Sequence, residues 1–294
     1  KLSIKDGATI RGIVFDGASE VADAIRIDDT VTGAPVVISG CTVRNYTNRF
    51  VYVSLSGKIE SLTIDDCIFI GADNSTTNKA IYASSAHTQV ETLSVTNSTF
   101  LNFNTGSNYF FRINCGEELV LMPVVLIDHC TFYNCYDRRG VYLYNAGRST
   151  IKNCISAFSE RRDDTKSFTA YGDESIVKNV ISYNVDLYGS APKENIISKN
   201  PLFVDAENGN FQLYKDSPAV GAGDDGSDLG DPRWGVSTEN APVGELPYEC
   251  FKKPYSMSPT THSVRILWQT LDANPSGTVY YGKTPDLGQK VTAE

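Results

Sequence analysis

A short hydrophobic pattern recurs along the first two thirds of the chain. Each copy opens with an aliphatic residue and two polar or small residues, as in Ile38-Ser-Gly-Cys-Thr-Val43, and its fourth position is called the anchor here. The anchors recur at intervals of 24 to 32 residues: Ile13, Cys41, Cys67, Ser98, Cys130, Cys154 and Val180. Such a short copy cannot bury a hydrophobic face by itself, so the copies must stack. The pattern predicts an all-β fold, a right-handed parallel β-helix (solenoid) over residues 1–199.

Two columns of residues follow from this stacking. Cys41, Cys67, Cys130 and Cys154 share the anchor column, where neighbouring Cα atoms lie about 4.8 Å apart. A disulfide could span that distance, but stacked side chains point in parallel, so we expect buried, reduced thiols. Four residues after the anchor, Asn and Gly recur and tolerate the left-handed backbone of a sharp turn. This second column contains Asn45, Asn102, Asn134 and Asn184, with Gly17 and Gly71 in phase.

A second strand alternates strictly between the anchors. Its copies are Ile25-Arg-Ile27, Val51-Tyr-Val53, Ile81-Tyr-Ala83, Phe111-Arg-Ile113, Val141-Tyr-Leu143 and Thr169-Ala-Tyr171. The outer residues of each triplet should point inward, because successive strand side chains face opposite ways. The central residues Arg26, Tyr52, Tyr82, Arg112 and Tyr142 should then form a ladder on one outer face. Ahead of these strands come, again in register, Asn48-Arg49, Asn78-Lys79, Asn108-Tyr109 and Arg138-Arg139.

The two longest intervals, 67–98 and 98–130, must place their extra residues in turns, since stacking fixes the strand lengths. We therefore expect loops near residues 71–78 and 103–108, beside the Tyr/Arg ladder.

The repeat stops near residue 200, where the composition changes. Asn200-Pro-Leu-Phe-Val-Asp205 and Ser217-Pro-Ala-Val-Gly-Ala-Gly223 have turn residues that cannot continue the coil. With these motifs the chain resembles pectate lyase-like and chondroitinase B-like β-helix proteins, many of which close in this way. Asp228-Leu-Gly-Asp-Pro-Arg-Trp-Gly235 resembles the tail of β-helix proteins from Bacteroidota surface systems. The resemblance predicts a β-helix domain over residues 1–235, with a closing segment from about residue 200.

A different pattern follows. Residues 236–250 read as a linker, because they are rich in Gly, Pro, Ser, Thr and Glu and lack periodicity. Next come Pro254-Tyr-Ser-Met-Ser-Pro-Thr-Thr-His-Ser-Val-Arg-Ile-Leu-Trp-Gln-Thr270 and Gly277-Thr-Val-Tyr-Tyr-Gly-Lys-Thr284. With these segments, residues 251–294 resemble the opening strands of a fibronectin type III-like module, of the kind that precedes the metallophosphatase domain of purple acid phosphatase-like proteins. A complete sandwich needs about 90–100 residues, so we expect an incomplete module and a chain that is a fragment of a longer protein.

Charge and composition narrow the partners. The formal net charge is −9 and the pI is near 4.9, which argues against nucleic acid. No apolar run is long enough to span a membrane. The three histidines are scattered and no C-x-x-C pair occurs, so we expect no metal or other cofactor. Ca²⁺ at Asp224, Asp225 and Asp228 is the exception we keep open, although turn carboxylates in solvent are the commoner situation.

Lyase chemistry has candidate residues but an incomplete motif. Eliminating a uronate linkage requires neutralisation of the carboxylate and a base for the C5 proton. Lys79, Arg112 and Arg139 are the catalytic candidates. In chondroitinase B-like lyases, and also in alginate lyases, an Arg-His pair follows the outer strand. Here Asn145-Ala146 stands in that place, which favours a role other than catalysis.

Three interpretations of the Tyr/Arg ladder stay open. The first is a solvated sheet face, where Tyr and Arg are favoured cross-strand neighbours. The second is a polysaccharide-binding face, in which rings stack on sugar and Arg pairs with acidic groups where the glycan has them. The third is a lyase. For the second we expect an extracellular, cell-surface or periplasmic monomer, and the binding residues are Tyr52, Tyr82, Arg112, Arg138, Arg139, Tyr142 and Tyr144.

Overall fold

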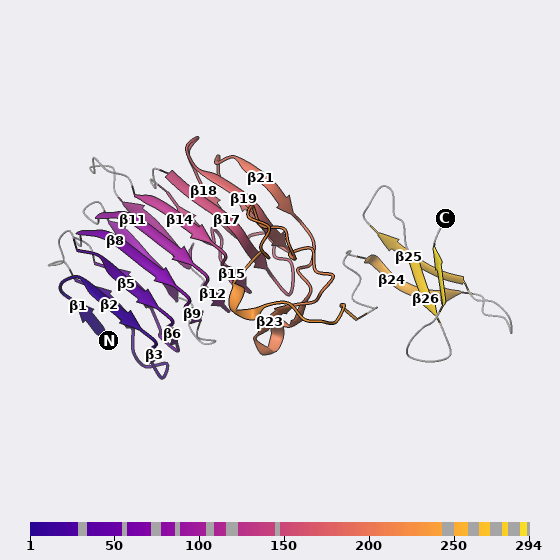
Figure 1. Ribbon diagram of the computed structural model, residues 1–294, viewed down its shortest axis with the longest axis horizontal. Coiled ribbons are helices and arrows are strands. Elements are labelled where there is room, and N and C mark those ends of the chain that lie inside the picture. Colours follow the sequence, from indigo (N-terminus) through magenta and orange to yellow (C-terminus); the bar gives the residue numbers. More distant parts are fainter. Residues whose placement is uncertain are drawn as a thin grey trace. The chain divides into compact units, whose positions relative to one another are not determined.

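The chain folds into two compact units, residues 1–238 and residues 239–294. The computed structural model describes residues 1–28, 34–54, 58–71, 78–85, 89–103, 109–115, 123–144, 148–242, 250–257, 265–270, 278–281 and 289–292. Within these ranges the regular structure is β-strand, apart from two short 3-10 helices. The predicted all-β parallel β-helix is confirmed, and its stacked strands are visible in Figure 1.

Two parallel sheets form the β-helix. The first, which we call the ladder sheet, has eight strands in the order of the chain: β1 (Leu2–Ile4), β4 (Asp23–Ile27), β7 (Arg49–Val53), β10 (Lys79–Ser85), β13 (Phe111–Cys115), β16 (Val141–Leu143), β18 (Lys166–Ala170) and β20 (Asp186–Tyr188). All of its pairings are parallel, as expected for coils stacked one above the next.

The second sheet, which we call the bent sheet, has thirteen strands in two rows. The row before the anchors comprises β2 (Ala8–Arg11), β5 (Val36–Ser39), β8 (Lys58–Asp65), β11 (Gln89–Thr96) and β14 (Val124–Asp128). The row after them comprises β3 (Val14–Asp16), β6 (Thr42–Arg44), β9 (Ile68–Ile70), β12 (Thr99–Leu101) and β15 (Thr131–Tyr133). The rows join in β17 (Arg148–Ala157), which pairs with both β14 and β15, and continue to β19 (Ile176–Tyr183) and β21 (Lys193–Ile197).

A left-handed residue makes the bend between the two rows. The residue before each anchor has a positive φ: Gly12, Gly40, Asp66, Asn97, His129, Asn153 and Asn179. The predicted second column is confirmed at Asn45, Asn102, Asn134 and Asn184, whose φ values lie between 51° and 59°. Gly17 and Gly71 in that column are not left-handed. A Cβ at Gly71 would lie 2.3 Å from the carbonyl oxygen of Asn102, so close approach explains the glycine there.

The anchor column has the predicted register. Cys41, Cys67, Cys130 and Cys154 are buried and free, as expected. Burial raises the pKa of the Cys67 thiol to about 12, which makes it an unreactive core group. Beside the column, Phe100 stacks between Phe69 and Phe132 with both ring-centroid distances at 4.9 Å. The interior is therefore held by columns of like residues, one from each coil.

One predicted repeat was wrong by one residue. The last copy of the second strand is Phe168-Thr169-Ala170, because Tyr142 pairs with Thr169 and Leu143 with Ala170. Phe168 and Ala170 point into the core, where Phe168 packs edge-on against Phe132. Tyr171 thus follows the strand and was misplaced as an inward residue by the sequence pattern.

The closing segment does not extend the stack. β22 (Phe203–Asp205) pairs antiparallel with β23 (Asn210–Leu213), next to the 3-10 helix η1 (Ala206–Asn208). The chain then runs back along the outside of the bent sheet. Gly230 N–H donates to the Asn153 carbonyl, and the guanidinium of Arg233, in η2 (Pro232–Trp234), donates to the Asn97 carbonyl. Phe211, Leu213, Ala219 and Leu229 cover the outward side chains of Leu101, Tyr133, Ile155 and Ile181.

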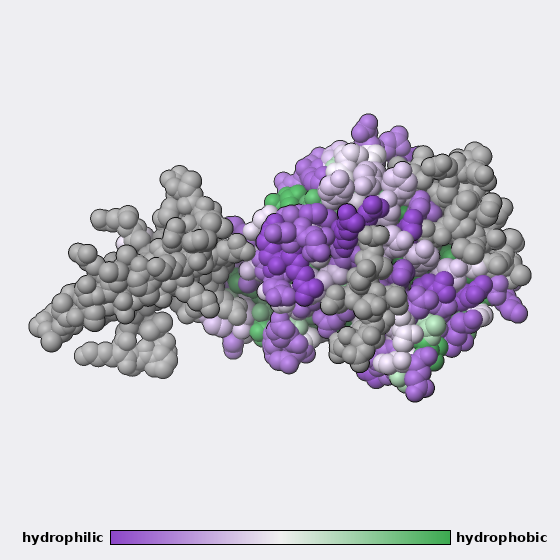
Figure 2. Space-filling model, turned by 180° about the vertical axis from the view of Figure 1, so that it is seen from behind, coloured by the Kyte–Doolittle hydropathy of each residue, from purple (hydrophilic) through white to green (hydrophobic). Residues whose placement is uncertain are grey.

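The C-terminal unit has two antiparallel strand pairs. β24 (Cys250–Met257) pairs with β25 (Arg265–Thr270), and β26 (Thr278–Tyr281) pairs with β27 (Gln289–Thr292). The predicted β-helix loops fall largely on residues 72–77 and 104–108, which lie outside the described residues. On the face of the β-helix shown in Figure 2, hydrophilic residues predominate and hydrophobic patches are small.

Truncation of the central aromatic column tests the stacking of coils. We expect Phe100→Ala to lower the free energy of unfolding by about 3–5 kcal/mol, because the cavity lies between two rings that cannot close it. Val14→Ala, at an exposed position of β3, should change it by less than about 0.5 kcal/mol. Urea denaturation followed by far-UV circular dichroism measures both. Equal effects of the two variants would contradict the assigned core.

Candidate functional site

The predicted Tyr/Arg ladder is aligned across five coils. Arg26 pairs with Tyr52, Tyr52 with Tyr82, Tyr82 with Arg112, and Arg112 with Tyr142. The column continues through Thr169 to Tyr188. The flanking residues of each strand are buried, so the ladder side chains extend from the opposite face of the ladder sheet.

The rings of the ladder pack on one another. Centroid distances are 6.1 Å from Tyr52 to Tyr82, 6.2 Å from Tyr82 to Tyr109, 5.8 Å from Tyr109 to Tyr142 and 5.7 Å from Tyr142 to Tyr144. Tyr109 was not among the predicted binding residues, although it stands in the column of pairs that precedes the strands. Its ring bridges two ladder tyrosines across the Arg112 coil.

Cationic side chains lie over these rings. The guanidinium carbon of Arg49 is 3.6 Å from the Tyr52 centroid, that of Arg112 is 4.4 Å from Tyr109, and that of Arg139 is 4.7 Å from Tyr142. The Lys79 ammonium is 5.9 Å from the Tyr82 centroid. At these distances each cation is attracted by the ring quadrupole. The face is therefore one continuous aromatic and cationic layer.

Buried carboxylates balance part of this charge. Arg49 donates to both oxygens of Asp23, each at 2.8 Å. The pKa of Lys79 lies below its usual value, chiefly because of burial, while Asp137 opposes that shift and Arg49 and Arg112 add to it. Burial is also the main cause of the raised pKa of Tyr109, which accepts a hydrogen bond from Arg112. Among the described residues named around the ladder, the cations outnumber the carboxylates. The cations are Arg26, Arg49, Lys79, Arg112 and Arg139, and the carboxylates are Asp23 and Asp137.

Solvent reaches only part of the layer. Tyr52 and Tyr142 are each 5% exposed, so neither offers a free ring face to a ligand. Tyr144 is 39% exposed and Tyr188 is 56% exposed. Both belong to the last coils, as does the exposed Arg138. The most exposed rings therefore lie at the C-terminal end of the ladder sheet, whereas Tyr82 and Tyr109 nearer its centre are half-buried.

A cleft of about 300 Å³ opens at this end, lined by Tyr171, Leu187, Tyr188, Gly189, Ser190 and Lys193. Tyr171 packs edge-on against Tyr144, with centroids 5.7 Å apart, and so connects the cleft to the ladder. The Lys193 ammonium donates to the carbonyls of Gly189 and Ala191 at 2.8 and 3.2 Å. Sequence reasoning missed Tyr188 and Lys193 because they follow the last anchor.

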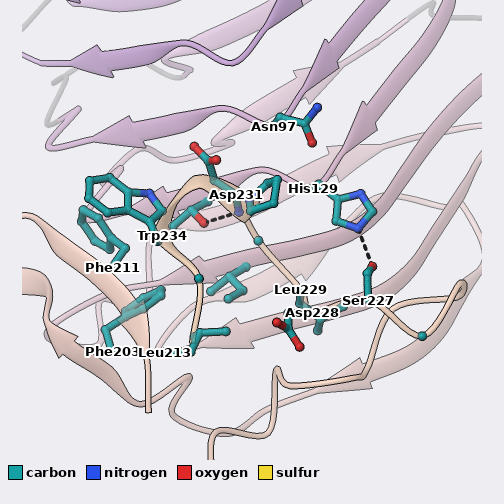
Figure 3. A pocket seen from close by; sticks show the side chains of 16 residues that line it. Asn97, His129, Phe203, Phe211, Leu213, Ser227, Asp228, Leu229, Asp231 and Trp234 are labelled. Atoms are coloured by element: carbon teal, nitrogen blue, oxygen red, sulfur yellow. Dashed lines mark hydrogen bonds between the residues drawn. The ribbon is translucent and has the colours of Figure 1, made fainter. Parts of the chain in front are cut away.

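A second cavity, of about 380 Å³, lies under the closing segment. Figure 3 shows Phe203, Phe211, Leu213 and Trp234 on one side of it, and His129 pointing toward Ser227 on the other. Its apolar lining comes mainly from the closing segment, whereas the bent sheet contributes Asn97, His129 and Thr131 beside Ile155. Sequence reasoning assigned it no role.

The suggested Ca²⁺ carboxylates have protein partners. Asp224 accepts hydrogen bonds from Asn153, Lys178 and Lys152, which hold its pKa well below the usual value. Asp228 accepts the backbone N–H of Gly221 at 2.8 Å. Across the described ranges, no group of three or more His, Cys, Asp or Glu residues is placed to hold a metal. In the same ranges no helix is long and apolar enough to cross a membrane.

Comparison with known families matches the two parts of the β-helix separately. Residues 1–105 match a domain of unknown function (DUF4957), and residues 125–234 match another domain of unknown function (DUF5123). No curated protein matches the chain. The second match includes the C-terminal end of the ladder sheet and the closing segment. Neither family description carries an activity, and the catalytic assignments of Lys79, Arg112 and Arg139 stay predictions.

The ion pair at the N-terminal end of the ladder can be tested against a neighbour. We expect Arg49→Ala to destabilise the β-helix by roughly 3 kcal/mol, because it leaves the buried Asp23 carboxylate without its cation. Arg44→Ala breaks a pair with Asp16 between the same two coils, but both partners are exposed, so stability should hardly change. Thermal and urea unfolding measure the difference. Equal losses would show that burial of Asp23 is not what matters.

Proposed function

We propose that this chain is a polysaccharide-binding β-helix protein, exported as part of a glycan-utilisation system at the cell surface. The ladder sheet forms the binding face, and the glycan binds at the C-terminal end of this sheet. The resemblance to pectate lyase-like and chondroitinase B-like proteins supports a polysaccharide as the partner. The proposed fibronectin type III-like module presents the β-helix to its ligand.

The observation that carries this proposal is the group of exposed rings beside the cleft. Tyr144 and Tyr188 expose ring surface on which the C–H groups of a pyranose can stack, as apolar groups do on aromatic faces. Arg139 lies among Tyr142, Tyr144 and Tyr171 and supplies a guanidinium for a uronate or sulfate. A scaffold face has no need of exposed rings next to a cleft.

The buried centre of the layer has a supporting part in this proposal. Tyr52, Tyr109 and Tyr142 are packed between cations and neighbouring rings, which fixes their rotamers and thereby the positions of the exposed rings. A preorganised site spends less binding free energy on ordering its side chains. Tyr52, Tyr82 and Arg112, predicted as contact residues, therefore act mainly by positioning Tyr144, Tyr171 and Arg139.

A lyase acting on uronic-acid polysaccharides is the second candidate. Burial lowers the pKa of Lys79, which leaves more of its amine unprotonated and able to accept a proton, and Arg112 with Tyr109 lies in the same layer. Elimination creates an unsaturated uronate that absorbs ultraviolet light. Incubation of the chain with polygalacturonate, alginate and chondroitin sulfate tests this directly. Absorbance that grows with wild type and disappears with Lys79→Gln would replace the binding proposal with the enzymatic one.

Binding energetics separate stacking from charge. Arg139→Ala should cost about 1.5–3 kcal/mol toward an acidic glycan, the range for a hydrogen bond to a charged group. Tyr188→Ala should cost about 0.5–1.5 kcal/mol, and Tyr188→Phe much less, because the phenyl ring keeps the stacking surface. A higher salt concentration should weaken glycan binding by wild type more than binding by Arg139→Ala, because the variant has already lost part of the electrostatic attraction that salt screens.

Isothermal titration calorimetry with a panel of acidic and neutral polysaccharides measures these losses. Arg148→Ala is the matched control, since this exposed arginine lies on the bent sheet and pairs with Glu174. If Arg139→Ala and Tyr188→Ala bind as wild type does, or if no glycan binds, the face is only a scaffold.

A further inference from the structure

A turn of the closing segment is fastened to the outside of the bent sheet by charged side chains. Asp224 is 3.2 Å from the Lys152 ammonium and 3.0 Å from that of Lys178. The Asn153 side-chain amide donates to Asp224 at 2.9 Å, and its oxygen Oδ1 accepts the backbone N–H of Asp224. One further contact, between His129 and Ser227, joins the same turn to the end of β14 (Figure 3).

This contact is part of a chain of four side chains. Asp128 Oδ1 is 2.9 Å from His129 Nδ1, and His129 Nε2 is 2.7 Å from Ser227 Oγ. Ser227 Oγ in turn contacts Asp225 Oδ1, and the Ser227 N–H donates to that same oxygen at 3.0 Å. The first three members have the geometry of a nucleophilic serine, its histidine base and an orienting carboxylate. Asp225 distinguishes this arrangement from such a triad.

The number of protons available to these four side chains decides which one donates in each contact. Two ionised carboxylates can only accept, so three contacts in a row require three protons. A neutral imidazole and a hydroxyl together supply two, whereas an imidazolium and a hydroxyl supply three. With His129 doubly protonated, Nδ1–H donates to Asp128, Nε2–H donates to Ser227, and the hydroxyl donates to Asp225. A general base would need a free lone pair at Nε2 facing the hydroxyl proton, and this arrangement has none.

We propose that His129, as an imidazolium, is a pH-dependent latch that holds the 223–228 turn against the β-helix. The turn supplies Gly226, Ser227 and Asp228 to the wall of the 380 Å³ cavity, so the latch also fixes that wall. When the imidazolium loses one proton, only two protons remain for the three contacts. At one contact two lone pairs then face each other. The proposal concerns the closing segment and does not depend on glycan binding.

The groups that face His129 favour its charged form. The hydrogen bond to Asp128 is the main cause of its raised pKa, Asp225 adds to it, and burial and the Lys152 ammonium oppose it. Lys152 is itself paired with Asp128 and Asp224 at 3.4 and 3.2 Å. The stabilisation is fully present below the unfolded-state pKa of about 6.5 and is lost as pH rises through the higher folded-state pKa.

The position of His129 suggests a variant that should fold. Its φ of 50° places it in the left-handed column where other coils have Asn97, Asn153 and Asn179. His129→Asn therefore keeps a residue that tolerates this backbone and removes only the titrating ring. Asp225→Asn keeps an acceptor for the Ser227 hydroxyl but removes the second carboxylate.

The test follows the full chain by histidine NMR titration and by thermal unfolding across pH 6 to 9. We expect a resonance titrating above about 6.5 that is absent in His129→Asn and shifted to lower pH in Asp225→Asn. Wild type should exceed His129→Asn in Tm by on the order of 2–4 °C near pH 6, and this difference should vanish at high pH. His87→Asn, which removes another imidazole, is the control. Its Tm should exceed that of His129→Asn near pH 6 just as the Tm of wild type does.

Three results would overturn the latch. The first is a His129 resonance that titrates at or below about 6.5. The second is a Tm difference between wild type and His129→Asn that does not change with pH. The third is covalent labelling of Ser227 by a fluorophosphonate at neutral pH, because an activated serine would show that His129 is neutral and acts as a base. Absence of labelling in wild type agrees with the proton count.

Discussion

Each coil of this β-helix must hydrogen-bond in register with the coils above and below it, and most other features of the structure follow from that requirement. Parallel pairing places equivalent residues about 4.8 Å apart, so whatever one coil puts at a position is in contact with the same position of the next coil. Inside the helix this produces the cysteine column and the stack of Phe69, Phe100 and Phe132. Outside it produces the layer of tyrosines and cations. A residue suited to only one coil would disturb two neighbours.

The two outer faces use this regularity differently. The bent sheet presents Leu101, Tyr133, Ile155 and Ile181 outward, and the closing segment covers them. Near the end of this segment, Asp231 accepts from the Thr99 hydroxyl at 2.6 Å and pairs with Arg233 at 2.7 Å. Burial raises the pKa of Asp231, and its hydrogen bonds compensate for that burial. The ladder sheet has no comparable cover among the described residues and presents polar rings and charges instead.

Much of the fold could be predicted because the repeat constrains it. The anchors identified the interior column, and strict alternation identified the ladder from Arg26 to Tyr142. The last predicted copy of the second strand was misplaced by one residue because Phe168 and Tyr171 both suit an inward aromatic position, and only packing against Phe132 selects Phe168. The exposed fraction of a ladder ring could not be predicted either, since it depends on which neighbouring rings stack over it. The contact between His129 and Ser227 joins residues 98 positions apart, beyond the reach of a pattern with a period near 28.

The central claim is that a polysaccharide contacts the exposed rings at the C-terminal end of the ladder sheet. Hydroxyl-radical footprinting of the full chain, with and without polygalacturonate, alginate, chondroitin sulfate and a neutral galactan, tests it most directly. The account predicts that at least one polymer lowers the oxidation of Tyr144, Tyr171 and Tyr188 and leaves Tyr214, on the closing segment, unchanged. Unaltered oxidation of the three rings with every polymer, or protection confined to residues outside the ladder sheet, would contradict it.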